Sequence, residues 1–237
     1  VTTTVELRAD DPAVRVTTAW DQRARDHRLR VHLPLPEPAD HSDAEDAYAV
    51  VRRPLWAEGG PNEWGVPTFP SRRFVRAGGL TVTHEGLCEY ELVDLDHEVV
   101  RGVEPPAGTT ARTLALTLVR STGWLSRGPM PSRPQPAGPF DRLEGAQTLG
   151  PLELRYALQL DRSPGALDPH ALADHVWNPL RPVVAPGGGD LGDRGTRLAV
   201  DGTTTTLVDG ADGIEVDAVV RDDVGRLVVR AHATGDG

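Results

Sequence analysis

Apolar and polar residues alternate along most of the chain, a pattern typical of strands that bury one face. The alternation is most regular over residues 152–160, where apolar residues at every second position are separated by polar or small ones. Shorter runs of the same kind occupy residues 5–7, 14–16, 29–33, 114–118, 198–200, 203–208, 214–220 and 227–231. Asp222-Asp223 followed by Gly225 predicts a hairpin turn between the last two runs. The pattern predicts about a dozen antiparallel strands.

The segment 68–94 predicts strands joined by turns. Gly78-Gly79 interrupts it where a positive φ costs little. Leu80, Val82 and His84 then share one face by alternation, and Glu85-Gly86 gives a second turn signal before the alternation resumes at Tyr90. We expect an antiparallel hairpin here.

Only residues 168–177 favour a helix. Asp168 suits the N-cap and Pro169 the first helical position. Leu172, Ala173 and Val176 would then face a sheet. The predicted fold class is all-β: a large antiparallel β-sandwich with one short helix. A subdivision near 145–150 and a single large sandwich fit the pattern equally well.

Three stretches read as loops. The strand at 29–33 is expected to end at Pro34 and Pro36, leaving residues 36–47 as an acidic, exposed loop. Residues 54–67 form a longer irregular loop with two Trp and two Glu, and residues 125–145 are rich in Pro and Gly. A long loop of mixed composition is typical of a functional or partner-facing segment.

The charge of the chain excludes some functions. The net charge is −10, with acidic residues spread along the 237-residue chain. This argues against nucleic-acid partners, which require a basic face. The absence of Lys excludes Schiff-base chemistry, and the one cysteine, Cys88, excludes an internal disulfide. No apolar run is long enough for a membrane helix, and no secretory signal precedes the first strand. We expect a cytoplasmic protein, cut at both ends from a longer one.

The candidate chemistry in the sequence is sparse. His84-Glu85-Gly86-Leu87-Cys88 resembles a metalloprotease motif, but a Cys replaces the second His and the segment reads as strand and turn, so a structural role is favoured. His170 and His175 are five residues apart on the helix and face different directions, which favours a surface role. Glu58 and Glu63 are the carboxylate pair in an aromatic-containing loop, as glycoside chemistry requires.

A series of short motifs resembles bacterial α-mannosidases of glycoside hydrolase family 38. The first runs from Trp20 through Asp26-His27-Arg28-Leu29-Arg30-Val31 to Leu33-Pro34, and the second is Thr68-Phe69-Pro70 with Phe74-Val75. The third joins Gly79-Leu80 to Glu89-Tyr90-Glu91. The fourth is Leu114-Ala115-Leu116-Thr117-Leu118 with Arg120, Gly123 and Leu125-Ser126-Arg127, and the last combines Gly145-Ala146-Gln147, Gly150 and Tyr156-Ala157-Leu158. Their order and spacing carry the resemblance. The sequence departs from the family pattern at Arg76, where an acid is common, and at Cys88.

The resemblance implies the C-terminal region of such an enzyme, a sandwich of the galactose-mutarotase-like supersandwich kind spanning 1–237. The family's catalytic barrel, with its nucleophilic Asp and a zinc ion held by His and Asp, lies upstream, and none of its motifs occurs here. We therefore expect no catalytic residue, metal or cofactor in this segment. Its partners would be the catalytic domain of the same polypeptide and a mannoside, hydrolysed with retention. Residues 56–67 are the candidate rim loop, with Glu58, Glu63 and Trp64 near the substrate.

Two other functions stay open. A carbohydrate-binding module would use exposed Trp residues on a sheet face or loop. A sugar epimerase of mutarotase type would need a converging acid and base. His84 and Glu85 point to opposite faces of a regular strand, which disfavours that third function.

Overall fold

The computed structural model describes residues 1–47, 49–86, 89–98, 103–128, 130, 132–178 and 214–233. The chain forms two compact units, residues 1–178 and 179–237. In the first unit, the strands are β1 (Thr2–Glu6), β2 (Val14–Gln22), β3 (Arg28–Ala39), β4 (His41–Asp46), β5 (Ala49–Pro54), β6 (Thr68–Phe69), β7 (Phe74–Ala77), β8 (Leu80–His84), β9 (Tyr90–Leu95), β10 (Ala111–Arg120) and β11 (Gly150–Leu160). A 3₁₀ turn spans Glu144–Gln147, and helix α1 spans Pro169–Trp177.

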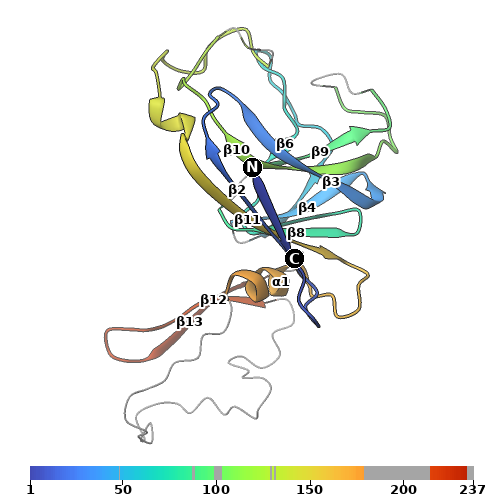
Figure 1. Cartoon of the computed structure of the whole chain (residues 1–237), viewed down its shortest axis with the longest axis vertical. Coiled ribbons are helices and arrows are strands. Elements are labelled where there is room, and N and C mark those ends of the chain that lie inside the picture. Colours follow the sequence, from blue (N-terminus) through green and yellow to red (C-terminus); the bar gives the residue numbers. More distant parts are fainter. Residues whose placement is uncertain are drawn as a thin grey trace, which may run out of the picture. The chain divides into compact units, whose positions relative to one another are not determined.

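The strands of the first unit form two antiparallel sheets. The larger has the order β1-β2-β11-β8-β7-β4-β5, and the smaller has the order β3-β10-β9-β6. Figure 1 shows β3, β9 and β10 in one layer and β4 and β8 in the other. The two inner faces form one core, and the hydroxyl groups of Tyr90 and Ser42 lie 2.8 Å apart across it. The predicted all-β sandwich is confirmed.

The expected loop at 36–47 is wrong, because β3 continues to Ala39 and β4 occupies most of the remainder. Pro36 and Pro38 lie in a register shift of β3 against β10, between the pairs Pro34–Thr113 and Ala39–Ala111. Their missing N–H groups therefore interrupt no regular ladder, and β3 is in addition an edge strand. In β4, Ala44 belongs to the core, and Glu45 is almost fully buried despite its charge.

The predicted hairpin over 74–84 is confirmed. β7 pairs with β8, and Gly78 and Gly79 have φ values of 52° and 80°. The turn at Glu85-Gly86 does not lead to a third strand of the same sheet, because β9 belongs to the smaller sheet. The segment 68–94 therefore contributes strands to both layers.

Helix α1 begins as predicted. The Asp168 carboxylate caps it by accepting hydrogen bonds from the backbone N–H groups of His170 and Ala171. Leu172 and Ala173 are buried, and Leu172 packs with Ala13 and Ala157 in a small apolar cluster separate from the main core. The helix covers part of β7 and β8, which explains why every residue of β8 is buried.

In the second unit, the structure describes residues 214–233. Strands β12 (Ile214–Arg221) and β13 (Leu227–Ala233) pair antiparallel, and Gly225 in the connection has a φ of 83°. The predicted hairpin is confirmed. The strands expected at 198–200 and 203–208 lie outside the described residues. Within the described parts of the chain, no helix has the length and apolarity needed to span a membrane.

Candidate functional site

The loop between β5 and β6 is folded back on itself. Gly60 and Glu63 exchange backbone hydrogen bonds of 2.8 and 3.3 Å, which closes a tight turn. Gly65 passes so close to an earlier part of the loop that a Cβ atom there would lie 1.9 Å from the carbonyl oxygen of Ala57. The shape of the loop therefore depends on the absence of a side chain at position 65.

This loop presents the three predicted substrate-proximal residues to the surface. Glu58, Glu63 and Trp64 are all exposed, and the Trp64 side chain is 53% accessible. Trp56 is half-buried, so the two Trp residues of the loop differ in environment. The substrate roles of Glu58, Glu63 and Trp64 stay predictions.

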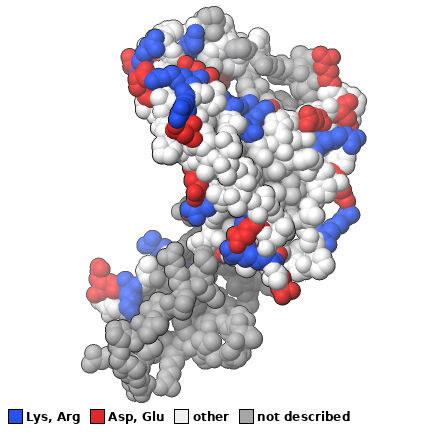
Figure 2. Space-filling model, in the orientation of Figure 1, with Lys and Arg blue, Asp and Glu red and all other residues white. Residues whose placement is uncertain are grey.

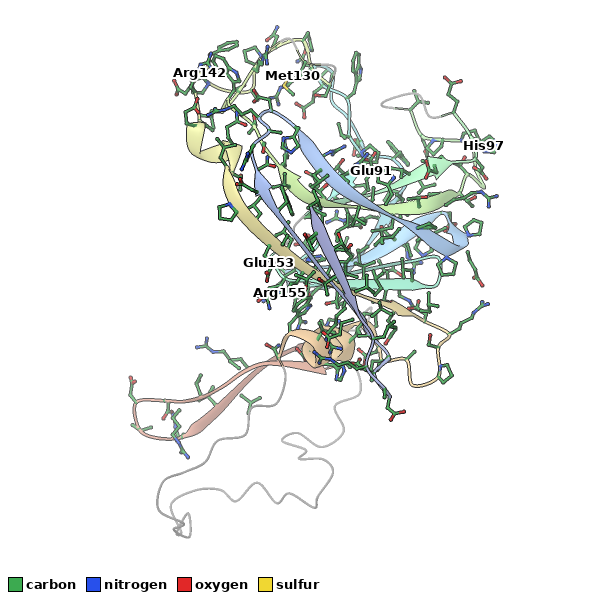
Figure 3. All side chains as sticks on the ribbon, viewed as in Figure 1. Glu91, His97, Met130, Arg142, Glu153 and Arg155 are labelled. Carbon is green, nitrogen blue, oxygen red and sulfur yellow. The ribbon has the colours of Figure 1, made fainter. Side chains whose placement is uncertain are left out.

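A second loop, residues 121–147, touches the first. The backbone N–H of Trp64 donates a 2.7 Å hydrogen bond to the carbonyl oxygen of Ser132. Within the second loop, the Arg142 guanidinium lies 4.3 Å from the centre of the Trp124 ring, in the range of a cation–π contact. Figure 3 shows Met130 and Arg142 at the same end of the first unit. We name residues 56–67 and 121–147 together the two-loop surface.

A polar latch holds the second loop to the sandwich. The Asp26 carboxylate accepts hydrogen bonds from the Gly123 backbone N–H at 2.7 Å and from Gln147 Nε2 at 3.1 Å. The Asp26 backbone N–H in turn donates to Gln147 Oε1 at 2.9 Å. Hydrogen bonds from Gln147 and then Gly123 lower the pKa of Asp26, so the carboxylate stays ionised in its role as acceptor.

The latch continues into the sandwich. The Ser121 hydroxyl donates to the carbonyl oxygen of Gln147 at 2.8 Å and accepts from Gln22 Nε2 at 3.2 Å. A Cβ atom at Gly123 would lie 2.6 Å from Gln147 Nε2, so a side chain there would have to displace the Gln147 amide from its contact with Asp26. Sequence reasoning quoted Asp26, Gly123 and Gln147 in three separate motifs but missed that they converge. The one signal in the sequence was that all three residues belong to the short motifs on which the family resemblance rests.

Replacing Asp26 with glycine is expected to release the second loop. Asp26 has a φ of 51°, which glycine adopts without strain, so the variant removes the carboxylate without straining the backbone. Limited proteolysis should then cut within 121–147 at least about tenfold faster, because two latch hydrogen bonds to a charged group are lost. The matched control Asp26→Asn keeps an acceptor oxygen and tolerates the same φ. Equal cleavage rates in Asp26→Gly and the wild type would contradict the latch.

Among the histidines whose side chains the structure describes, His84 alone has a clearly shifted pKa, and it lies beside Ser71 in the interior. Its Nε2 atom is 2.9 Å from the Ser71 hydroxyl oxygen, and that hydroxyl donates its own proton to the carbonyl oxygen of Phe74 at 2.7 Å. His84 must therefore donate from Nε2, which leaves Nδ1 as the unprotonated atom. Nδ1 is buried with no partner. The Ser71 hydroxyl is thus an acceptor towards His84, the reverse of an activated nucleophile.

Burial also decides the charge of His84. It lowers the pKa of this side chain to about 4, and the nearby charge of Glu45 offsets only part of the effect. The Glu85 side chain is exposed and lies 4.0 Å from Arg155. The acid and base that an epimerase would need are thus in different environments, one enclosed and one at the surface.

The stability of the first unit is expected to fall as the pH drops from about 6.5 to about 4. In this window the unfolded chain protonates His84, whereas the folded state, with a pKa of about 4, does not. Above the unfolded pKa, His84 is neutral in both states and stability is not reduced. Below it, the free energy of unfolding falls by up to about 3 kcal/mol, because the folded state binds the proton more weakly than the unfolded chain. Urea denaturation across this range measures it. The His84→Gln variant should show a shallower pH slope, and an unchanged slope would contradict the assignment.

The described residues contain no group of three or more His, Cys, Asp or Glu side chains placed to hold a metal ion. Cys88 lies outside the described residues, so the motif that begins at His84 is seen only in part. The described His84 does not fit a ligand role, because its Nε2 atom bonds to Ser71 and its ring is enclosed.

Comparisons with known proteins found a similar sequence and similar solved structures. No protein-family model matches the sequence. The chain is 29% identical over 133 residues to a Halalkalibacterium halodurans protein named "Putative mannosylglycerate hydrolase", a match that covers 53% of this chain and 13% of that protein. The chain thus spans only about an eighth of this relative.

Two solved structures are also similar. One is an α-mannosidase from Enterococcus faecalis V583, with a TM-score of 0.46, and the other is a glycosyl hydrolase family 38 protein from Enterococcus faecalis, with a TM-score of 0.47. Each is 24% identical, and each match covers 66% of this chain and 15% of the other.

Proposed function

We propose that the chain is the non-catalytic C-terminal β-sandwich region of an α-mannosidase-type glycoside hydrolase. Its two-loop surface packs against the catalytic domain of the same polypeptide and shapes the rim of the carbohydrate site. Two lines support this proposal. The motifs follow the family order along most of the chain, and a relative named as a mannosylglycerate hydrolase matches 133 residues of it.

The observation that carries the proposal is the apolar character of the two-loop surface. Its exposed residues include Trp64 and Val66 from the first loop and Leu125, Met130 and Phe140 from the second. Phe140 is 56% accessible. Large apolar side chains gathered on touching loops mark an interaction surface, because exposing them to water is costly. A catalytic domain packed here would cover them.

Basic and acidic side chains neighbour one another on the surface of the first unit, the end with the second loop included, where Arg25 pairs with Glu144. Figure 2 shows Arg side chains beside Asp and Glu side chains on the visible face of the first unit. Pairs such as Arg28 with Glu89 and Arg30 with Glu91 contribute to this mixture. Such a surface does not supply the basic face of a nucleic-acid-binding protein.

The longer polypeptide provides the direct test. Its upstream sequence should encode a barrel with a His-x-Asp zinc motif and a nucleophilic Asp, and the purified protein should hydrolyse an aryl α-mannoside and contain zinc. Residues 1–237 alone should show neither turnover nor bound zinc. Turnover by the isolated chain above a buffer blank would refute the non-catalytic role.

Gly65→Ala is expected to lower kcat/KM of the longer enzyme by about 10–100-fold, because a Cβ at this position must displace the backbone of the rim loop. Gly60→Ala is the matched control in the same loop: a Cβ there has nothing within 4 Å, so kcat/KM should stay within about twofold of wild type. Steady-state kinetics on a series of α-mannosides measures both variants. An equal kcat/KM for Gly65→Ala and wild type would exclude a rim role for this loop.

A carbohydrate-binding module is the second candidate, and the exposed indole of Trp64 favours it. A sugar ring could stack on this face as it does on other accessible aromatic side chains. The isolated chain would then bind mannosides saturably, and Trp64→Ala would abolish binding. Absence of binding at millimolar mannoside would exclude this candidate while leaving the rim role intact.

A further inference from the structure

A cavity of about 400 Å³ lies away from the two-loop surface, where three segments of the first unit meet. Its walls come from the crossover between β3 and β4, the turn between β7 and β8, and the turn after β11. None of the described residues of 56–67 and 121–147 lines it. The volume falls within the range of small-molecule sites, about 300–1,000 Å³.

Backbone hydrogen bonds hold the segments that line the cavity together. The Glu37 backbone N–H donates to the carbonyl oxygen of Gly78 at 2.9 Å, and the Asp161 backbone N–H donates to that of Gly79 at 3.0 Å. A Cβ at Gly78 would lie 2.1 Å from the carbonyl oxygen of Glu37, so the chains approach this closely only with glycine there. The walls are thus preorganised by backbone contacts, as a binding site requires.

The charged groups of the cavity are already paired. Asp161 accepts from Arg76 Nε at 2.6 Å and from the Thr81 hydroxyl at 2.7 Å. Arg162 pairs with Glu37 at 2.6 Å across another part of the wall. At the β3–β4 turn, the carboxylate of Asp40 contacts the His41 ring, whose hydrogen bond lowers the pKa of Asp40.

The donors and acceptors of these ion pairs determine which hydrogen-bonding groups a ligand needs. A carboxylate only accepts and a guanidinium only donates, whereas a hydroxyl does both. A lining that carries both kinds therefore matches neighbouring hydroxyl groups. Because each charge has a partner, a ligand with its own charge would have to compete with an existing ion pair, and a neutral one would not.

We propose that this cavity is a second binding site, for a neutral polyhydroxylated molecule of monosaccharide size. Ala39 and Ala77, both largely buried, also line the cavity. The inference does not depend on the proposed rim function, because the residues of the two surfaces do not overlap.

NMR titration of the isotope-labelled chain with methyl α-D-mannopyranoside tests the proposal. The backbone amides of Ala77, Gly78 and Gly79 should shift saturably, and putrescine, a cationic probe of similar reach, should leave them unmoved. Asp161→Asn should weaken binding by at least about tenfold, since a charge-assisted hydrogen-bond network is lost. Arg162→Gln removes a side chain that is 83% accessible, so the fold is unaffected while the affinity should fall several-fold.

Trp64→Ala separates this site from the two-loop surface. The variant should leave the shifts at Gly78 and Gly79 unchanged. Three results would overturn the proposal: shifts confined to residues 56–67, shifts with putrescine but not with the mannoside, or an affinity that Asp161→Asn and Arg162→Gln both leave as in the wild type.

Discussion

Replacing Arg73 with methionine is expected to lower the free energy of unfolding of the first unit by about 3–5 kcal/mol. Arg73 clamps the carboxylate of Glu45: Nε lies 2.9 and 2.8 Å from its two oxygens, and Nη2 lies 2.6 Å from one of them. The Glu45 side chain is only 1% accessible, so the variant would leave a charge buried without its partner. Urea denaturation measures the loss.

The same guanidinium ties the sheet to helix α1. It donates to the Asp174 carboxylate at 3.2 Å and lies 3.2 Å from His170 Nδ1. The His170 ring packs edge-on against Phe74, with ring centroids 4.9 Å apart. The expectation of a surface role for both helix histidines thus holds better for His175, which is more exposed, than for His170.

The double variant Glu45→Met with Arg73→Met is the control. It removes both charges and fills their volume with apolar atoms, so it should regain most of the stability lost in Arg73→Met. Amide hydrogen exchange of α1 should rise in the single variant as the helix loses its anchor. If the two substitutions added instead of compensating, the ion pair would not be the cause.

Replacing Leu116 with alanine is expected to cost about 2–5 kcal/mol. Leu116 lies near the middle of β10, is fully buried, and belongs to the core cluster between the two sheets. The truncated side chain would leave a cavity that the strands on either side cannot close, because β10 is hydrogen-bonded to both β3 and β9. Denaturant titration at neutral pH gives the value.

Leu160→Ala is the matched control. Leu160 ends β11 and is 53% accessible, so the same substitution there should change stability by less than about 0.5 kcal/mol. Equal losses at positions 116 and 160 would mean that the two sheets do not share the core described here.

Local sequence signals predicted several elements closely. Asp168-Pro169 located the start of α1 because capping and proline chemistry act within one turn. Gly78-Gly79 located the β7–β8 turn because its φ values are positive. The regular alternation at 152–160 located β11, which begins two residues earlier than the pattern indicates.

The errors arose where the environment came from distant parts of the chain. Residues 36–47 looked like a loop because proline and acidic residues disfavour central strands. Their strands form because β3 is an edge strand and because Arg73, 28 residues away, neutralises Glu45. No pattern within residues 36–47 predicts that Arg73 pairs with Glu45.

For the candidate site too, the sequence predicted the local features and the structure supplied the long-range contacts. The sequence marked residues 56–67 as a loop with surface residues, and Glu58, Glu63 and Trp64 are indeed exposed. That this loop touches residues 121–147, and that Asp26 latches the second loop through Gln147, depends on contacts across about 70 to 120 positions.

The fold class, the helix and the main turns could be predicted from the sequence alone, because alternation, capping and glycine conformations are local properties of the chain. Only the tertiary structure decided which charges are buried, which sheet each strand joins, and where the motif residues meet. Those outcomes depend on packing between segments far apart in the sequence, and the cavity lined by Arg76 and Asp161 is formed from three of them.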